Sequence, residues 1–207
     1  EIIVRQQAER YRPFGVSEGR AHLVKPEIDF IKARADFYPV LFENHSAGKL
    51  PLRVSHNDTK CNNVLLDNTT RKALCVIDLD TVMPGSALYD FGDALRMGAS
   101  TAAEDEVNLD TVNFDEKAFE GFARGYLSEM KDSLTKTEIE LLPFSAKLLT
   151  YECGIRFLTD YLNGDTYFKI HREKHNLDRA RNQFKLVRDI ESKEDELGKI
   201  VERLIAE

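Results

Sequence analysis

The chain has 207 residues, of which 42% are hydrophobic and 31% charged, a balance typical of one folded domain or one large lobe. Thirty-six acidic residues against 29 basic ones give a net charge of −7, which argues against binding to nucleic-acid phosphates. Three cysteines without C-x-x-C spacing favour a reducing compartment, and no apolar run is long enough to span a membrane. The chain begins at Glu1 without a visible signal peptide, so we expect a cytoplasmic protein whose sequence starts partway through a longer one.

The N-terminal third predicts a connecting segment, a helix and a β-hairpin. Residues 1–26 hold short runs interrupted by proline and glycine, which are typical of a linker. Apolar residues then recur at helical spacing over 27–46, with a kink expected at Pro39. Two apolar runs, 63–67 and 73–78, are separated by five polar residues and predict a hairpin. No further strand is expected.

The rest of the chain predicts helices. The apolar spacing favours helices over 87–97 and 115–131, a long helix that a Thr135–Glu138 capping box opens and Asn163-Gly164 ends, and two more over about 176–191 and 193–206. In the second of these we expect Ala118, Phe119, Phe122, Tyr126 and Met130 to point inward. The predicted fold class is therefore mainly α with a small β-hairpin (α+β).

The informative residues surround the predicted hairpin. His56, Asp58 and Asn63 form an H-x-D-x-x-x-x-N pattern immediately before its first strand. Its second strand ends in Ile77-Asp78, so that Asp78 follows Asp58 by twenty positions. A hairpin returns the chain to its starting end, and we therefore expect the side chains of Asp58, Asn63 and Asp78 to converge.

Phosphoryl transfer requires this combination of groups. One carboxylate, Asp58, would orient the attacking hydroxyl and accept its proton. The amide oxygen of Asn63 and the carboxylate of Asp78 would hold Mg²⁺ against the phosphates of ATP, since Mg²⁺ prefers a few hard oxygen ligands. Lys60 would reach the transferring phosphate and offset its charge.

The same residues carry a family resemblance. H-x-D-x-K-x-x-N followed by a strand-ending aspartate resembles the catalytic and metal-binding loops of the protein-kinase-like fold. The Ile77-Asp78-Leu79-Asp80 sequence resembles the aminoglycoside phosphotransferase and choline kinase superfamily, and residues 53–60, 76–85 and 156–164 are similar to N-acetylhexosamine 1-kinases. The resemblance implies that Asp58 is the base, that Asn63 and Asp78 bind Mg²⁺, and that an anomeric hydroxyl attacks the γ-phosphate.

The resemblance also assigns supporting and substrate-binding residues. It implies that His56 packs beneath the catalytic loop and that Asp90, at the start of the next helix, supports that loop. It directs Arg156 and Tyr167 toward the sugar. Independently of the resemblance, Arg156 has a possible ion-pair partner in Asp160, four residues further along the helix.

Asp93 has two readings. It follows the metal loop directly, which favours a role in substrate binding. It also lies three residues before Arg96, so that the two side chains would form an ion pair on the helix surface.

The resemblance implies an enzyme of two lobes. Residues 27–207 are the expected C-terminal catalytic lobe, and residues 1–26 the connection to it. The sequence contains neither a glycine-rich phosphate loop followed by a strand lysine nor a Walker loop. We therefore expect the N-terminal nucleotide-binding lobe to be absent and this chain alone to be inactive.

Two alternatives to a sugar kinase stay open. A kinase for choline, an aminoglycoside or another small alcohol would keep the fold and change the acceptor. A non-catalytic interaction lobe belongs to a different class of function, but such a protein would be expected to have lost Asp58, Asn63 or Asp78, and all three are present.

Overall fold

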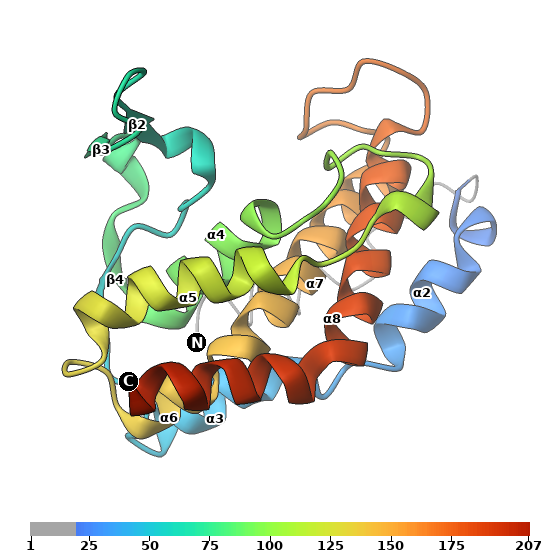
Figure 1. The fold of residues 1–207 in the computed structure, drawn as a ribbon. Helices are drawn as coiled ribbons and strands as arrows, with labels where there is room; N and C mark the ends of the chain where they lie inside the picture. The colour runs from blue at the N-terminus through green and yellow to red at the C-terminus, as the bar shows by residue number, and fades with distance from the viewer. Residues whose placement is uncertain (1–19) are drawn as a thin grey trace.

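The computed structural model of the protein describes residues 20–207 and is mostly helical (Figure 1). Most of the predicted connecting segment therefore lies outside the described residues, and its last part forms a short 3-10 turn, η1 (Ala21–Leu23). Within residues 20–207, no helix is long and apolar enough to cross a lipid bilayer.

The elements follow one another as two helices, a region of short strands and then five more helices. The α-helices are α2 (Lys25–Lys32), α3 (Phe37–Ser46), α4 (Ala87–Gly98), α5 (Glu116–Met130), α6 (Lys136–Glu140), α7 (Leu142–Leu162) and α8 (His175–Ala206). The strands are β1 (Arg53–Ser55), β2 (Val64–Leu66), β3 (Ala73–Val76) and β4 (Met83–Gly85), which form two antiparallel pairs, β1–β4 and β2–β3. The predicted hairpin and the helix over 87–97 are confirmed.

The helix predicted over 27–46 is in fact two helices. A turn at residues 33–36 separates α2 from α3, so the break lies before Pro39 and not at it. Pro39 falls in the first turn of α3, where backbone N–H groups have no partner within the helix and a proline is therefore tolerated.

The predicted capping box exists but opens a short helix. Thr135 Oγ1 accepts a hydrogen bond from the Glu138 N–H at 3.2 Å, and the Thr135 N–H donates to Glu138 Oε2 at 2.7 Å. Because Pro143 lies at the beginning of α7, α6 ends at Glu140 and a separate helix begins. The stop signal is confirmed, since Gly164 adopts a φ of +92° directly after Asn163.

The two C-terminal helices predicted from the sequence are one continuous helix, α8, which Figure 1 shows to be bent along its length. The bend keeps its apolar stripe against the rest of the molecule over its full length. Leu177 and Val187 lie in one hydrophobic cluster and Leu197 and Leu204 in the other.

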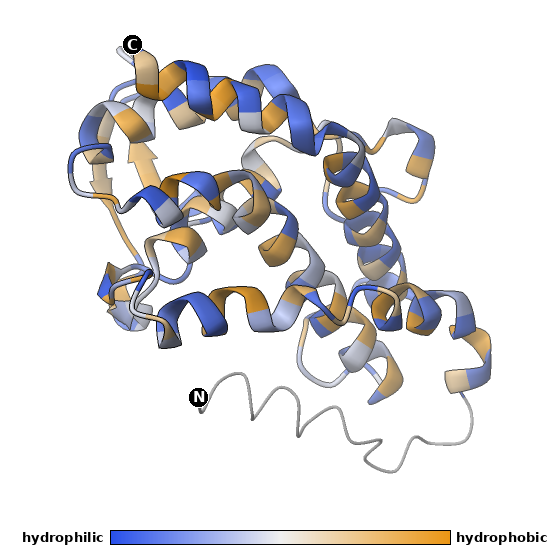
Figure 2. Ribbon diagram, turned by 90° about the horizontal axis from the view of Figure 1, so that it is seen from below, coloured by the Kyte–Doolittle hydropathy of each residue, from blue (hydrophilic) through white to orange (hydrophobic). Residues whose placement is uncertain are grey.

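The core forms where α7 lies between α4 and α8. Two glycines allow the close approach: a Cβ at Gly92 would lie 2.4 Å from the Ser145 carbonyl oxygen, and one at Gly154 would lie 2.6 Å from the Phe184 ring. Hydrophobic and hydrophilic bands alternate along the outer helices (Figure 2), as expected for helices that are buried on one side.

Four of the five residues predicted to point inward from α5 do so, since Phe119 is buried and Ala118, Tyr126 and Met130 pack against the hydrophobic core. Phe119, Ala123 and Leu127 are its fully buried residues, whereas Phe122 is 40% exposed. Phe122 instead lies at the edge of an aromatic group, 5.4 Å from Phe91 and 6.4 Å from Tyr126 between ring centroids.

Asp160 organises the loop that follows α7. It is 5% exposed, and its carboxylate accepts hydrogen bonds from the backbone N–H groups of Thr166, Tyr167 and Phe168 at 2.8–2.9 Å and from Asn176 Nδ2 at 2.8 Å. The alternative ion pair with Arg156 is therefore not formed, because this carboxylate is already fully used and Arg156 is exposed.

Replacing Asp160 with alanine is expected to lower the free energy of unfolding by about 3 kcal/mol, because four donors would lose a charged acceptor inside the protein. For a chain of this size the melting temperature should fall by roughly 6–12 °C. Thermal denaturation followed by circular dichroism measures this change. The matched control is Asp132→Ala, an exposed position whose substitution should change the melting temperature little.

Candidate active site

Two strand pairs hold the segment that carries the H-x-D-x-x-x-x-N pattern. The β2–β3 ladder pairs Val64 with Val76 and continues with a hydrogen bond of 2.9 Å from the Ile77 N–H to the Asn63 carbonyl oxygen. It therefore places Asn63 beside the residue that precedes Asp78.

The β1–β4 pair was missed in the sequence. It aligns Ser55 with Met83. The segment that leads into residues 56–63, the predicted catalytic loop, therefore lies beside the segment that follows Asp78 and its 3-10 turn, Leu79–Thr81. Each of these strands has only three residues, and β4 consists of Met83-Pro84-Gly85, which carries no alternating pattern.

The charged and amide side chains meet at one corner of the hairpin. Lys60 Nζ lies 2.6 Å from Asp58 Oδ2 and 3.6 Å from Asp78 Oδ2. Asn63 Nδ2 donates to the Asp58 carbonyl oxygen at 2.8 Å and to Asp58 Oδ2 at 3.0 Å. The structure thus brings all four of these predicted site residues together.

His56 connects the two halves of this corner. Its Nδ1 accepts a hydrogen bond from the Asp58 N–H at 3.2 Å, so the ring proton lies on Nε2 and is donated to the Ile77 carbonyl oxygen at 2.9 Å. The neutral imidazole therefore fixes the backbone at Asp58 relative to the backbone before Asp78.

Asp90 holds the catalytic loop from the other side. In the first turn of α4, its two carboxylate oxygens accept hydrogen bonds from the His56 and Asn57 N–H groups, each at 2.8 Å. Thr59 Oγ1 donates to the Asp90 carbonyl oxygen at 2.6 Å. Asn57 adopts a φ of 63°, a strained conformation that these contacts maintain.

The electrostatics of the corner keep Asp58 ionised. Burial acts to raise the pKa of Asp58, but the hydrogen bond and positive charge of Lys60, together with the Asn63 amide, outweigh it and lower the pKa below the usual value. The hydrogen bond to Asp58 in turn raises the pKa of Lys60. At neutral pH the corner therefore holds an anionic Asp58 and a cationic Lys60.

The donor set at this corner suits a hard divalent cation held together with phosphates. Asn63 Oδ1 accepts no hydrogen bond from the described residues, and the Asp78 side chain is 46% exposed. Residues 20–207 contain no group of three or more His, Cys, Asp or Glu side chains arranged around a metal site. One amide and one carboxylate that rely on further oxygens from a nucleotide match the preference of Mg²⁺.

Asp93 and Arg96 form their ion pair, but not on the surface. Arg96 is 8% exposed, and its Nε lies 3.2 Å from Asp93 Oδ1 while its Nη1 lies 2.6 Å from Glu104 Oε1. Two carboxylates thus neutralise one buried guanidinium beside the C-terminal half of α4.

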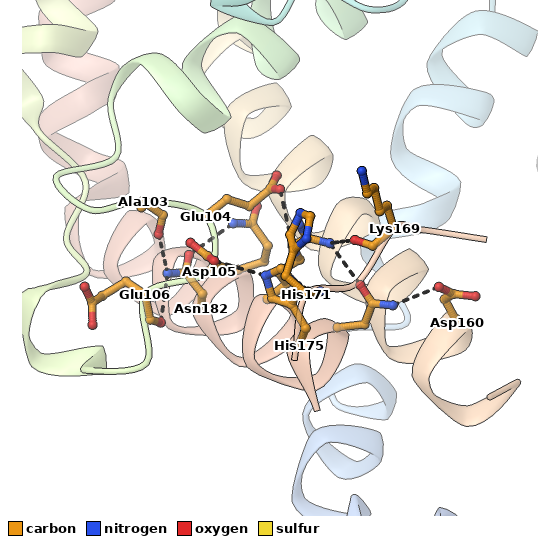
Figure 3. Close-up of polar contacts among 12 residues, drawn as sticks. Ala103, Glu104, Asp105, Glu106, Asp160, Lys169, His171, His175 and Asn182 are labelled. Carbon is orange, nitrogen blue, oxygen red and sulfur yellow. Dashed lines mark hydrogen bonds and ion pairs between the residues drawn. The ribbon is translucent and has the colours of Figure 1, made fainter. Parts of the chain in front are cut away.

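The loop that carries Glu104 is anchored on both sides of this residue. Asn182 Nδ2 donates to the Ala103 carbonyl oxygen at 3.0 Å, and His175 Nε2 lies 3.0 Å from Asp105 Oδ2 (Figure 3). His175 is buried and its Nδ1 accepts the His171 N–H, so the proton that reaches Asp105 lies on Nε2. Glu104 is therefore a fixed partner for Arg96.

Arg156 and Tyr167, the predicted sugar-binding residues, both flank Phe168. The Arg156 guanidinium lies 5.4 Å above the Phe168 ring, and the Tyr167 ring packs edge-on against the same ring at 4.8 Å. Tyr167 is 74% exposed, and within the described part of the chain no side-chain hydrogen bond, ion pair or ring contact joins either residue to residues 56–63.

The thiol of Cys153, on α7, is buried. Burial raises the pKa of Cys153 to about 11, and the charges of Arg96, Glu104, Arg156 and Asp93 all act on it.

Glu152 and Tyr89 were missed in the sequence. Burial raises the pKa of Glu152 to about 7 against the opposing charge of Arg156, and burial followed by the charge of Glu152 raises the pKa of Tyr89 to about 12. The available signal was a single carboxylate within an otherwise apolar stretch of α7. Tyr89 directly precedes Asp90 on α4.

A comparison with known protein families matches residues 5–130 to the phosphotransferase enzyme family APH. The matched residues include Asp90 and the catalytic corner, which consists of Asp58, Lys60, Asn63 and Asp78. Glu152, Arg156 and Tyr167 lie after the matched residues in the sequence. It covers more than half of the 207 residues, and the chain therefore belongs to the APH phosphotransferase family.

Proposed function

We propose that this protein is a kinase that transfers the γ-phosphate of ATP to the anomeric hydroxyl of an N-acetylhexosamine. The observation that carries the proposal is the catalytic corner, where Lys60 lies between the carboxylates of Asp58 and Asp78 and Asn63 donates to Asp58. Membership of a phosphotransferase family supports the reaction type.

Each residue of the corner has a role in this reaction. Asp58 accepts a hydrogen bond from the acceptor hydroxyl, orients the oxygen toward the phosphate and takes its proton. Lys60 balances the charge of Asp58 before the substrates arrive and faces the transferring phosphate afterwards. Asn63 Oδ1 and the Asp78 carboxylate would hold Mg²⁺, which would neutralise charge on the phosphates of the nucleotide.

The segment that carries the catalytic corner exposes many large apolar side chains. Large side chains with at least 38% exposure are concentrated between residues 52 and 83, namely Leu52, Val54, Leu65, Leu66, Leu74, Val76, Ile77, Leu79, Val82 and Met83. So many exposed large apolar side chains in one segment are unusual on an isolated soluble domain. We propose that a nucleotide-binding lobe and the adenine base cover some of these side chains in the active enzyme.

Residues 1–207 alone are therefore expected to show phosphotransfer at background level with ATP, Mg²⁺ and N-acetylglucosamine. A coupled assay for ADP release measures this. Robust turnover by this chain alone would show that no further nucleotide-binding lobe is required.

The acceptor is tested by a wider screen with the nucleotide-binding lobe present. N-acetylglucosamine and N-acetylgalactosamine are expected to stimulate ADP release, whereas choline and an aminoglycoside are not. Stimulation by the cationic acceptors instead would favour the alternative kinase. No stimulation by any acceptor, together with intact folding, would favour a non-catalytic interaction lobe.

A further inference from the structure

We propose that Thr81 and Asn57 are positioning residues for phosphotransfer, because together they attach the turn that follows Asp78 to the catalytic loop. The attachment sets where the proposed Mg²⁺ ligand, Asp78, lies relative to the proposed base, Asp58. This inference rests on the proposed function and adds to it the residues that align its two carboxylates. Thr81 ends the 3-10 turn η3 (Leu79–Thr81), and Asn57 directly precedes Asp58.

Thr81 and Asn57 make reciprocal contacts between the two segments. Thr81 Oγ1 donates a hydrogen bond to the His56 carbonyl oxygen at 2.7 Å. In the opposite direction, Asn57 Nδ2 donates to the Thr81 carbonyl oxygen at 3.1 Å and to the Ser55 carbonyl oxygen at 3.2 Å. Each side chain thus bonds to the backbone of the other segment. We call these contacts the Asn57–Thr81 clasp.

The clasp completes a frame around Asp78. Before Asp78, the His56 ring donates to the Ile77 carbonyl oxygen at 2.9 Å. After Asp78, the clasp attaches Thr81 to the same part of the catalytic loop. Residues 77–81 are therefore fixed at both ends to the two residues that directly precede Asp58. Without the clasp, only the first of these two attachments would remain to orient the Asp78 carboxylate.

A second copy of the same turn shows what the clasp changes. The tetrapeptide Leu-Asp-Thr-Val occurs at 79–82 and again at 109–112, where its first three residues form the 3-10 turn η4 (Leu109–Thr111). This second turn bonds to itself. Thr111 Oγ1 donates to the Asn108 carbonyl oxygen at 2.8 Å, and the Asn108 side chain caps the turn by accepting a backbone N–H at 3.2 Å. Asn108 has an ordinary φ of −77°.

Within the described residues, η3 makes neither of these local contacts. Asp78 takes the place of Asn108, but it has a φ of 64° and its side chain does not cap the turn. The Thr81 hydroxyl donates to His56 instead of to its own turn. Since the four residues of the two turns are identical, the sequence of the turn does not impose this difference. The local contacts are replaced by an attachment to the catalytic loop and by a carboxylate that is available to a ligand.

The clasp also explains the residue at position 57. Asn57 has a φ of 63°, a conformation that glycine and asparagine adopt more readily than most residues. Glycine would accept this backbone angle but would provide no side-chain donor, whereas asparagine provides both. Strand β4 leaves room for the amide, since a Cβ at Gly85 would lie only 3.0 Å from Asn57 Oδ1. Position 57 therefore combines the angle that the loop requires with the donor that the clasp requires.

Hydrogen exchange tests the clasp in the whole 207-residue chain without requiring turnover. Thr81→Val keeps the shape of the side chain and removes its hydroxyl. The matched control, Thr111→Val, removes the hydroxyl from the same tetrapeptide in η4. Thr81→Val should raise amide exchange about fivefold, the equivalent of one hydrogen bond, in residues 56–63 and 77–82. Thr111→Val should raise it only around residues 108–112. Wild-type exchange of residues 56–63 in Thr81→Val would overturn the clasp.

Kinetics in the presence of the nucleotide-binding lobe separate positioning from stability. Thr81→Val should lower kcat at least about tenfold and raise the Mg²⁺ concentration needed for half-maximal turnover, because Asp78 would no longer be aligned with Asp58. Thr81→Ser, which keeps the hydroxyl, and Thr111→Val should stay within about twofold of the wild type. If Thr81→Ser is as impaired as Thr81→Val, the hydroxyl is not the cause and the proposal is wrong.

Asn57→Gly tests the other half of the clasp. It keeps the left-handed backbone and removes the amide donor, so it should also lower kcat at least about tenfold. Because both substitutions break one attachment, the double variant Asn57→Gly/Thr81→Val should lose no more than about twofold beyond the more damaging single variant. Losses that multiply would show that the two side chains act independently and would contradict the clasp.

The outcomes also distinguish this inference from the proposed function. Turnover by the wild type that Thr81→Val leaves unchanged, in both kcat and Mg²⁺ dependence, would keep the kinase and reject the positioning residues. No turnover by the wild type with any acceptor, together with raised exchange of both segments in Thr81→Val, would reject the kinase and with it the positioning role, and would leave the clasp as a contact that only stabilises the fold.

Discussion

Asp58→Asn is expected to lower kcat by about 10²- to 10⁴-fold, the range that general-base catalysis contributes. The amide can still accept a hydrogen bond from the acceptor hydroxyl, but it cannot take the proton. Asn63 and Asp78, the proposed Mg²⁺ ligands, stay in place, so nucleotide affinity should change little. The measurement is kcat and KM for both substrates, with nucleotide binding determined separately, in the form of the enzyme that turns over.

The matched control for Asp58→Asn is Asp132→Asn, which removes the same charge at an exposed turn after α5. It should leave kcat within about twofold of the wild type, since a distant surface charge is screened by salt. Near-normal turnover in Asp58→Asn would remove Asp58 as the base. A rise in KM for the nucleotide with unchanged kcat would instead place Asp58 in ground-state binding.

The catalytic corner was predictable because it depends on one local feature. A hairpin with a short polar turn fixes the distance between its ends, so the closeness of Asn63 and Asp78 follows from strand pairing, whereas the position of Asp58 also depends on His56 and Asp90. Helix α4 and the capping box at Thr135 were likewise readable, because apolar periodicity and cap residues are local signals.

The features that were missed depend on contacts between distant segments. Strand β4 exists because β1 offers it a partner, and three residues that include Pro84 and Gly85 carry no pattern of their own. On α5 only Phe122 was wrongly expected to be buried: it is 40% exposed, whereas Ala123 and Leu127 are buried along with Phe119.

The surroundings of the residues expected to bind the acceptor were only partly predictable from the sequence, again because they depend on contacts between distant segments. Asp160 appeared as a partner for Arg156 from its i,i+4 spacing, yet the N–H groups of residues 166–168 take its carboxylate. Glu152 drew no attention because its environment is set by α4, more than fifty residues earlier in the chain. Spacing along one helix cannot reveal which residues of another helix face it.

Asp78 combines a proposed catalytic role with a conformation that is unfavourable for most residues. Its φ of 64° and ψ of 56° lie in the left-handed region, where a side chain other than that of glycine costs roughly 1–2 kcal/mol. Neither the neighbouring 3-10 turn nor the 3.6 Å contact with Lys60 explains this cost, because the side chain makes no capping hydrogen bond and is 46% exposed. Strain of this kind is often found at functional sites.

Two substitutions at Asp78 are therefore expected to differ in stability and to agree in activity. Asp78→Gly and Asp78→Ala both remove the proposed Mg²⁺ ligand and should each lower kcat by at least about 100-fold, as expected when a group that stabilises charge in the transition state is lost. Asp78→Gly relieves the backbone strain that Asp78→Ala retains, so its free energy of unfolding should be about 1 kcal/mol higher than that of Asp78→Ala.

Urea denaturation without Mg²⁺ measures the stability difference, and ADP release in the active form of the enzyme measures the loss of turnover. Glycine at a strained position would be tolerated by any loop, so the stability result alone says nothing about catalysis. The two results together do bear on catalysis. If Asp78→Gly is the more stable variant and yet loses phosphotransfer, then Asp78 is retained for its carboxylate and not for the stability of the fold. Full activity in Asp78→Gly would show that the Asp78 carboxylate is not needed, together with Asn63, to bind Mg²⁺. The strained backbone at this position would then have no connection with catalysis.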